Sequence, residues 1–484
     1  MTLLDSPELR SMVCVPPSIR LDDLLAATRG RLLGPTTVTS FSGAVVDSRR
    51  VTPRSCFVAL RGERVDGHDF VDEAIRNGAA VALVERPVEI APRTDAALVQ
   101  VDDSLTALQE LAAWWRDRHD VRVTGITGST GKTIAKEVVA DVLSRTLRVL
   151  RNEGNLNSET GLPMTLLRLE PEHEAAVLEM SMYTVGEIAR LAEIARPDVG
   201  VVLAVHPTHL ERAGSLERIA QAKAELPAAL PRDGLAVLNA DDARVSAMRD
   251  VTQAEVRTYG LGEGADVRAR DVASHGLHGT EFTIDAPWGS RRVRFANPGR
   301  HLVPHALAAA AVAERHGVPL DEVAEALADG SHAAHRMALA EAASGATLID
   351  DTYNASPVSV GGALDFLAET PVAAGRRRLA VLGDMLELGP EEELLHREIG
   401  QRAAQVVDGL VAVGERGRWI ADAARAAGLG RVATASDSFD AAGVLEREFA
   451  PVVGDLVLIK ASRGIELDRL VDQLIARPLR EIGA

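Results

Sequence analysis

A lysine and a threonine stand between a glycine-rich segment and a helical pattern, in residues 121–137, which read V-R-V-T-G-I-T-G-S-T-G-K-T-I-A-K-E. A β-branched run precedes the glycines, so the context is strand, loop and helix. The N–H groups of such a loop and the start of its helix bind phosphate oxygens. Lys132 can reach the β- and γ-phosphates of ATP, and the Thr133 hydroxyl can bind Mg²⁺. The sequence therefore predicts a phosphate site formed by Thr127, Gly128, Ser129, Thr130, Gly131, Lys132 and Thr133.

Three further polar residues lie near expected strands or helices of the middle region. Glu179 follows the apolar run 175–178 and could complete a Mg²⁺ site with Thr133, although taken alone an exposed acid beyond a strand is the more common case. His209 lies in the loop after the run 199–205, where a histidine is commonly a surface residue. Lys223 lies beside the apolar face of a helix, where it could also be a lysine whose stem covers apolar surface.

Two polar clusters follow expected strands near the C-terminus. One comprises residues 350–357 and contains Asp351, Tyr353 and Asn354; the other comprises residues 460–464 and contains Lys460, Ser462 and Arg463. Each cluster alone could be an ordinary turn. Two of them at the ends of strands in one α/β domain favour a binding site, because ligands of such sheets lie outside the carboxyl ends of the strands.

The composition is that of a large α/β enzyme with aliphatic cores. The chain has 484 residues, 46% hydrophobic residues, only 3% aromatic residues and a net charge of −17. The negative charge disfavours nucleic acid and anionic membranes as partners. Two cysteines exclude a disulfide framework, and neither a signal peptide nor an apolar run of ~18 residues is found. We expect a cytoplasmic protein without membrane insertion.

The alternation of apolar runs and helical stretches predicts an α/β fold with three domains: a small N-terminal α/β domain, a central P-loop-type domain with a parallel sheet, and a C-terminal Rossmann-like domain. We expect a flexible extension over 1–18 and domains over 19–117, 118–335 and 336–484. Residues 255–298 are expected to form an antiparallel addition, and residues 304–315 a helix. Further strands are expected at 56–60, 80–84, 97–101, 234–238, 347–349, 379–382, 409–413 and 456–459.

These segments together resemble the Mur ligase superfamily over about residues 40–475. The resemblance rests on the phosphate loop, on Gly154-Asn155-Leu156-Asn157, on Glu179-Met180 and on His209-Leu210-Glu211. It also rests on Asp351-Thr352-Tyr353-Asn354 and on the stretch L-G-D-M-L-E-L-G at 382–389. The last two signatures are most similar to the members that join D-alanyl-D-alanine to a UDP-N-acetylmuramoyl-tripeptide.

The resemblance implies an ATP-dependent amide-bond ligase that forms an acyl phosphate and acts in peptidoglycan precursor synthesis. It implies catalytic roles for Lys132, Glu179, His209, Lys223, Arg336 and Asp351, with Arg336 reaching the γ-phosphate. Lys223 matches a carbamylated lysine, so the implied Mg²⁺ ligands are Thr133, Glu179, His209 and Lys223. The implied substrate residues are Ser48, Arg49, Asn155, Asn157, Asp351, Tyr353, Asn354, Lys460, Ser462 and Arg463. We expect a monomer.

The chain departs from the family pattern at several positions. Ser181 and Ala204 replace a usual glycine and asparagine, and Leu302 and His305 stand where asparagines are usual. His305 is expected at the nucleotide, but recognition of the base differs, since asparagine donates and accepts while histidine needs the right tautomer. Two alternatives remain: a related ligase with another amino-acid acceptor, and a catalytically weak ATP-binding scaffold in cell-wall assembly.

Overall fold

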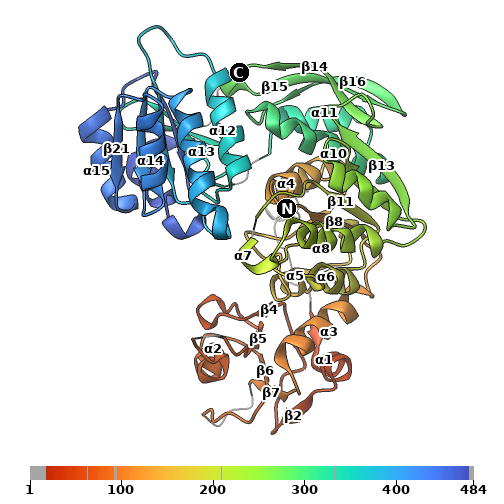
Figure 1. The fold of residues 1–484 in the computed structure, drawn as a ribbon. Helices are drawn as coiled ribbons and strands as arrows, with labels where there is room; N and C mark the ends of the chain where they lie inside the picture. The colour runs from red at the N-terminus through yellow and green to blue at the C-terminus, as the bar shows by residue number, and fades with distance from the viewer. Residues whose placement is uncertain (1–17, 63, 92–94, 209, 332–333, 479–484) are drawn as a thin grey trace, which may run out of the picture. The chain divides into compact units, whose positions relative to one another are not determined.

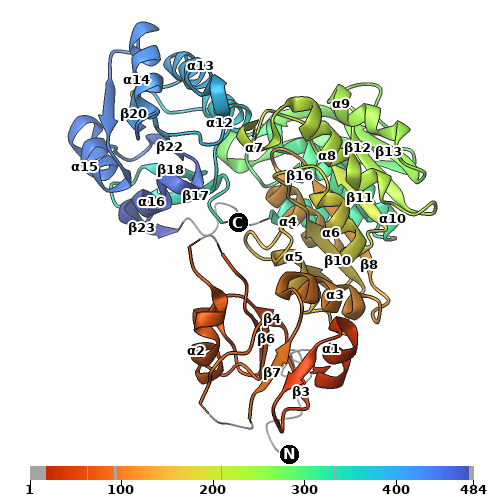
Figure 2. The same cartoon turned by 60° about the horizontal axis from the view of Figure 1, so that its bottom comes forward.

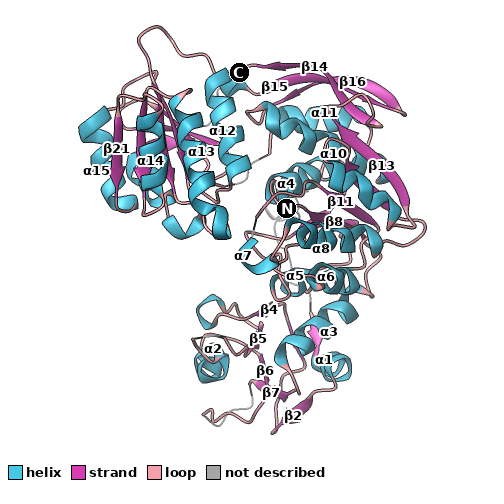
Figure 3. Ribbon diagram, in the orientation of Figure 1, coloured by secondary structure: helices cyan, strands magenta, loops and turns pink. Residues whose placement is uncertain are grey.

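The computed structural model describes residues 18–62, 64–91, 95–208, 210–331 and 334–478, so the extension expected at 1–18 lies almost wholly outside the described residues. The fold has two compact units. The first comprises the described residues of Met1–Val123, Leu147–Ser181 and Ala189–Pro197; the second comprises those of Thr124–Thr146, Met182–Ile188 and Asp198–Ala484. Helices and strands alternate in both units (Figure 3), which confirms the α/β class.

The first unit begins with a small sheet in the order β2-β7-β6-β5-β4. Its strands are β2 (Arg31–Leu33), β4 (Ala44–Val45), β5 (Cys56–Val58), β6 (Val81–Val84) and β7 (Ala97–Gln100). Strands β4 to β7 are parallel, and β2 joins β7 antiparallel. Helix α2 (Val71–Arg76) buries its apolar residues on this sheet, and β1 (Ile19–Arg20) pairs with β3 (Ser40–Phe41). Three of the predicted strands are thereby confirmed, each slightly shorter than expected.

The rest of the first unit contains the strand that carries Glu179. β10 (Ala175–Glu179) is buried along its whole length and pairs in parallel with β9 (Val149–Arg151). Helix α5 (Gly161–Leu166) lies between them in sequence, and α1 (Leu21–Thr28) and α3 (Ser104–Arg116) complete this unit. Helix α6 (Glu187–Ala195) contains residues of both units.

In the second unit, the sheet around the phosphate loop has the order β16-β15-β14-β13-β12-β11-β8. β8 (Arg122–Thr127), β11 (Val199–Val202), β12 (Leu235–Asn239) and β13 (Glu255–Gly260) are parallel, and their inner residues are buried. β14 (Val267–Ser274), β15 (Thr280–Ala286) and β16 (Gly289–Phe295) form an antiparallel meander at the edge (Figure 1).

The expectation of an antiparallel addition over 255–298 is therefore wrong for its first part. β13 continues the parallel sheet beside β12, and β14 begins parallel to β13. Short helical turns, α9 (Ala243–Ser246) and η4 (Ala247–Asp250), connect β12 to β13 and make this crossover possible. An alternating pattern predicts a strand but not its direction.

Two helices carry the lysines that the sequence predicts to be functional in this part of the unit. α4 (Lys132–Leu143) begins directly after the glycine-rich loop and packs against α10 (Val303–Arg315), which confirms the helix expected at 304–315. α8 (Leu216–Ala228) carries Lys223 and packs against β11. α7 (Leu210–Ala213) and α11 (Leu320–Asp329) complete the region.

The C-terminal part of the second unit has a sheet in the order β21-β20-β19-β22-β18-β17-β23. Its strands are β17 (Ala338–Ala342), β18 (Thr347–Asp350), β19 (Arg378–Gly383), β20 (Gly409–Val413), β21 (Val432–Ala435), β22 (Leu456–Lys460) and β23 (Ile475–Pro478). The strands from β21 to β18 are parallel, whereas β17 is antiparallel to both of its neighbours. The strands expected here are confirmed.

Helices cover both faces of this sheet (Figure 2). One face packs against α12 (Pro357–Glu369), α13 (Glu392–Ala404) and α14 (Gly417–Ala426), and the other against α15 (Ser438–Phe449) and α16 (Asp468–Leu474). This doubly covered sheet is the predicted Rossmann-like architecture. Over the described ranges, every helix is too short or too polar to cross a bilayer.

Candidate functional site

The glycine-rich loop forms an open cradle at the N-terminus of α4. Gly131 stands before the helix with φ +78°, a conformation that glycine adopts readily, and no side chain caps the helix. The N-terminus of a helix attracts an anion through its dipole and its N–H groups. Lys132 follows and its Nζ donates to the Gly128 carbonyl oxygen at 2.9 Å. This geometry fits the predicted phosphate site.

The segment after β11 supports the glycine-rich loop through hydrogen bonds. The Ser129 hydroxyl donates to the His206 carbonyl oxygen and accepts from the His206 N–H, both at 2.9 Å, and the Ser129 N–H donates to the Ala204 carbonyl oxygen. The side chain of Ser129 thus holds the loop rather than facing a ligand. Burial lowers the pKa of His206, and Lys223 acts in the same direction.

The imidazole of His305 lies against the loop. A Cβ atom on Gly131 would lie 2.5 Å from His305 Cε1, so the histidine fills the space that a side chain at position 131 would need. His305 Nδ1 is buried and has no partner among the described residues. Burial, together with His301 and Arg336, lowers the pKa of His305 to about 3. The ring is therefore neutral, with a polar atom beside the phosphate cradle.

Lys223 is buried, with 3% of its surface exposed, on the side of α8 that carries Ile219 and Leu226. Burial lowers the pKa of its ammonium group well below the usual value, and the charge of Lys132 acts in the same direction. Both effects favour the neutral amine of Lys223. His209, expected beside it, lies outside the described residues.

Arg336 connects the phosphate loop with the C-terminal part of the same unit. Its Nη2 donates to Thr133 Oγ1 at 2.8 Å, and its guanidinium carbon lies 4.1 Å from the centre of the Tyr353 ring. Arg336 Nε is buried without a partner among the described residues. A guanidinium so placed offers N–H groups to an oxyanion bound at the loop.

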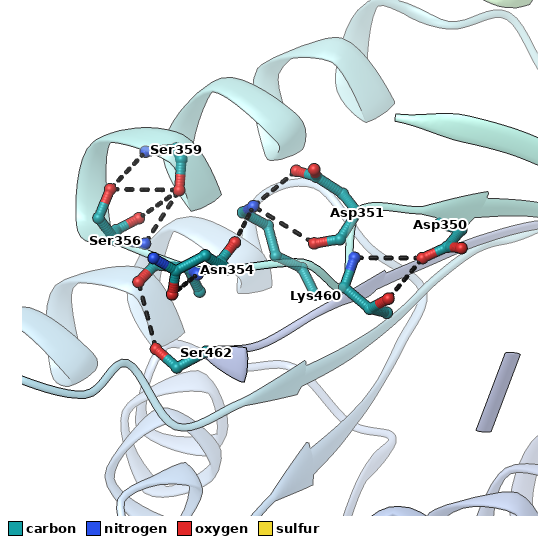
Figure 4. Close-up of polar contacts among 9 residues, drawn as sticks. Asp350, Asp351, Asn354, Ser356, Ser359, Lys460 and Ser462 are labelled. Carbon is teal, nitrogen blue, oxygen red and sulfur yellow. Dashed lines mark hydrogen bonds and ion pairs between the residues drawn. The ribbon is translucent and has the colours of Figure 1, made fainter. Parts of the chain in front are cut away.

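An ion pair organises the loops after β18 and β22. Lys460 Nζ lies 2.6 Å from Asp351 Oδ2 and also donates to the carbonyl oxygens of Asn354 and Asp351 (Figure 4). Lys460 and Asp351 are both buried. Burial lowers the pKa of Lys460, and the Asp351 carboxylate opposes that shift. The pair joins the ends of β18 and β22, and the ammonium group of Lys460 directs its hydrogens to these protein oxygens.

Ser462 connects three loops at the same sheet edge. Its hydroxyl donates to the Ala355 carbonyl oxygen at 3.3 Å and accepts from the Leu386 N–H at 2.9 Å, while its own N–H donates to the Asp384 carbonyl oxygen. Figure 4 shows Ser462 below the start of α12, where Ser356 and Ser359 cap the helix. Ser462 thus fixes the loops around a surface instead of presenting its hydroxyl to solvent.

Three predicted substrate residues remain accessible at this edge. Asn354 is exposed and Tyr353 is half-buried, with the guanidinium carbon of Arg463 6.0 Å from the centre of its ring. Arg463 is exposed and pairs with Asp468 at 2.9 Å. An aromatic face, an amide and a guanidinium are groups that can contact a short peptide.

The first unit holds the remaining predicted residues in two places. Asn157 Nδ2 donates to Glu179 Oε1 at 2.7 Å, Glu179 is buried at 3% exposure, and Asn155 is exposed nearby in sequence. In the small sheet, Ser48 is buried and the exposed Arg49 pairs with Asp47 at 2.8 Å. The hydrogen bonds from Arg49 lower the pKa of Asp47 to about 2.

Sequence reasoning missed several residues that hold the site. His206 supports the phosphate loop, His335 pairs with Asp350, and His396 Nε2 accepts from the N–H of Met385. Asp384 accepts from the N–H of Gly417, and burial raises its pKa. Only Asp384 lay inside a recognised motif. The histidines carried no local signal, because their partners are distant in sequence or are backbone groups.

Comparison with known proteins identifies the family. The sequence matches the Mur ligase family catalytic domain over residues 40–116, the Mur ligase middle domain over 126–313 and the Mur ligase glutamate ligase domain over 335–463. It is 38% identical to the UDP-N-acetylmuramoyl-tripeptide–D-alanyl-D-alanine ligase of Escherichia coli K12, covering 84% of this chain and 88% of that protein. The chain belongs to the Mur ligase family.

Solved structures of this family have the same fold. A crystal structure of MurF from Acinetobacter baumannii superimposes with a TM-score of 0.83 at 31% identity and covers 95% of this chain and 99% of that chain. The MurF ligase of Thermotoga maritima in complex with ADP gives a TM-score of 0.76 at 31% identity, covering 89% and 96% of the two chains. The similarity to Mur ligases thus extends over nearly the whole chain.

Proposed function

We propose that this chain is an ATP-dependent ligase that adds D-alanyl-D-alanine to a UDP-N-acetylmuramoyl-tripeptide in cytoplasmic peptidoglycan precursor synthesis. The observation that carries the proposal is the position of Arg336, which contacts both Thr133 of the phosphate loop and Tyr353 of the C-terminal loops. The relative from Escherichia coli and the MurF structures support the choice of reaction.

The reaction has two steps. A carboxylate oxygen of the tripeptide attacks the γ-phosphorus of ATP, and ADP leaves with the electron pair of the broken P–O bond. The amine of D-alanyl-D-alanine then attacks the acyl carbon, loses a proton and displaces inorganic phosphate. Both steps bring anionic groups together, so the main tasks of the protein are positioning and charge neutralisation.

The residues of the second unit fit these tasks. The start of α4 and the side chain of Lys132 would hold the phosphates, and Arg336, which contacts Thr133, would neutralise charge on the terminal phosphate. His305 offers its buried ring nitrogen to the nucleotide. In the C-terminal loops, Tyr353, Asn354 and Arg463 contact the dipeptide, while Asp351, Lys460 and Ser462 hold those loops in place.

Magnesium is the metal that fits the oxygen donors present. Thr133 offers a hydroxyl oxygen and Glu179 a buried carboxylate, and Mg²⁺ binds few protein oxygens besides phosphate and water. Over the described ranges, no group of three His, Cys, Asp or Glu side chains forms a protein-only metal centre. When bound, Mg²⁺ would neutralise phosphate charge; Glu179, Thr133, His209 and a carbamylated Lys223 are its proposed ligands.

The sugar nucleotide is proposed to bind the first unit. Ser48 and Arg49 lie after β4, and the exposed Arg49 can approach a phosphate. Asn155 and Asn157 follow β9, where Asn157 already contacts Glu179. These residues would bind the UDP-muramoyl peptide, and the protein would act as a monomer.

The test is phosphate release from ATP by the full chain with UDP-N-acetylmuramoyl-tripeptide. We expect release to depend on the acceptor and to be fastest with D-alanyl-D-alanine, compared with meso-diaminopimelate, L-lysine and glutamate. Faster release with any of those three amines would assign the chain to another ligase of the family. Phosphate release that does not depend on any of these acceptors would instead favour the alternative of a catalytically weak ATP-binding scaffold.

A further inference from the structure

Arg336 lies between two residues with an unusual backbone conformation. His335 has φ +59° and Met337 has φ +51°, so both adopt the left-handed region that residues with a Cβ atom seldom occupy. Such a conformation persists only where surrounding contacts enforce it. The direction in which the Arg336 side chain leaves the backbone is therefore set by whatever holds its two neighbours.

Met337 is held by the core and His335 by polar contacts. Met337 is 4% exposed and packs in the cluster that includes Ile349 and Val360. His335 Nδ1 lies 2.8 Å from Asp350 Oδ2, and the His335 carbonyl oxygen accepts from the N–H of Tyr353 at 3.0 Å. Because a carboxylate only accepts, Nδ1 carries the proton in this bond.

Asp350 is itself fixed as a partner for His335. It is the last residue of β18 and is 6% exposed. Its other oxygen, Oδ1, accepts from the N–H of Thr352 at 3.1 Å and from the Thr352 hydroxyl at 2.7 Å. The contacts with Thr352 thus fix the orientation of the Asp350 carboxylate independently of its contact with His335.

We propose that His335, held by Asp350, is a positioning residue that aims the Arg336 guanidinium at the γ-phosphate end of the nucleotide. The chain of contacts runs from β18 through Asp350 and His335 to Arg336 and ends at Thr133 Oγ1. This inference rests on the proposed function, because it takes the oxyanion beside Thr133 to be the nucleotide's terminal phosphate.

Two substitutions separate the side chain of His335 from its backbone conformation. H335G adopts the positive φ readily but lacks the bond to Asp350. H335N also tolerates the positive φ and can donate an amide hydrogen to Asp350. H275A is the matched control, since His275 also pairs with a carboxylate, that of Glu281 at 3.3 Å, on the exposed meander of the same unit.

The readout is the affinity for ADP and for the β,γ-imido analogue of ATP, measured by calorimetry with the full chain and Mg²⁺. We expect H335G to weaken binding of the analogue about tenfold, roughly one charge-assisted hydrogen bond, and binding of ADP less than about twofold. H335N should recover most of the lost affinity for the analogue. H275A should bind both nucleotides as the unmodified chain does.

Equal losses for the two nucleotides in H335G, or no loss for either, would overturn the proposal. So would an H335N variant that binds no better than H335G. A cycle with R336A gives a second test: if His335 acts through Arg336, H335G adds no further loss in the R336A background, whereas additive losses contradict it. These measurements use no muramoyl substrate, so they are distinct from the test of the ligase reaction.

Discussion

The ammonium group of Lys460 lies 2.6 Å from the carboxylate of Asp351, and both side chains are buried at the carboxyl ends of adjacent parallel strands. Lys460 also donates to two carbonyl oxygens, so its hydrogens are directed into the protein. The pair therefore belongs to the framework that shapes the acceptor loops, and it leaves Tyr353, Asn354 and Arg463 to face a substrate.

Replacement of Lys460 by methionine should destabilise the C-terminal part strongly. The variant leaves the Asp351 carboxylate buried without its counter-charge, and breaking such a pair typically lowers the free energy of unfolding by about 3–5 kcal/mol. Urea unfolding measures this loss. The double variant D351N/K460M should recover part of it, and R397A, which breaks an exposed pair with Glu393, should cost less than about 1 kcal/mol. A K460M variant as stable as the unmodified chain would contradict the structural role.

The K132A variant should lose ligase activity and keep its fold. Lys132 contributes a charge at the phosphate loop, and its Nζ donates to the Gly128 carbonyl oxygen. Removing one such charge from a preorganised site should reduce acceptor-dependent phosphate release by at least about 100-fold. Thermal unfolding followed by circular dichroism checks that the fold is retained. Near-normal turnover at saturating ATP would show that the loop does not bind the nucleotide.

The phosphate loop and the buried strands were predictable because their signals are local. Residues 121–137 contain the strand, the glycines and the helix start in one continuous segment, and continuous apolar runs predicted β10, β11 and β22. The direction of β13 was not predictable, since alternation has the same period in parallel and antiparallel strands. The connection through α9 and η4 determines that β13 runs parallel to β12.

Contacts between distant residues were beyond local patterns. The contact between Arg336 and Thr133 joins positions 203 residues apart, and the pairing of Lys460 with Asp351 depends on how β22 inserts beside β18. The hydroxyl of Ser129 binds the backbone of His206, a contact that no local pattern indicates. Residue type predicted where a site would form, and tertiary packing determined which side chains support it.

The buried His305 should make stability depend on pH. Its pKa is about 3 in the folded chain and ~6.5 when unfolded. Between these values the unfolded state binds a proton that the folded state does not, so stability decreases as the pH falls below about 6.5. From pH 7 to 5.5 this term amounts to about 1 kcal/mol. In H305N the loss of unfolding free energy over that range should be smaller by this amount, as measured by urea unfolding at both pH values. Equal pH dependence in the two proteins would contradict a buried neutral ring.

Lys223 should be carbamylated in the active protein. Burial lowers the pKa of Lys223 and so favours its neutral amine, whose nitrogen can attack the carbon of CO₂ and lose a proton, which yields a carbamate with one negative charge. The product is a hard oxygen ligand for Mg²⁺, whereas a lysine ammonium would repel the metal. A ¹³C NMR spectrum of the full chain under ¹³CO₂ should show a carbamate signal that is absent from K223A.

The K223A variant should also show what the modification contributes to activity. Without the carbamate oxygens, acceptor-dependent phosphate release should fall about 100-fold, the order of loss found when one preorganised electrostatic group is removed. Acetate or formate can enter the space left by the side chain and supply a carboxylate, so either acid should restore activity several-fold in K223A but not in K132A. The control is E217A, which removes an exposed carboxylate from the same helix and should leave the rate unchanged. If K223A keeps full activity without any additive, Lys223 is a lysine that merely packs along α8, and the carbamate has no part in the reaction.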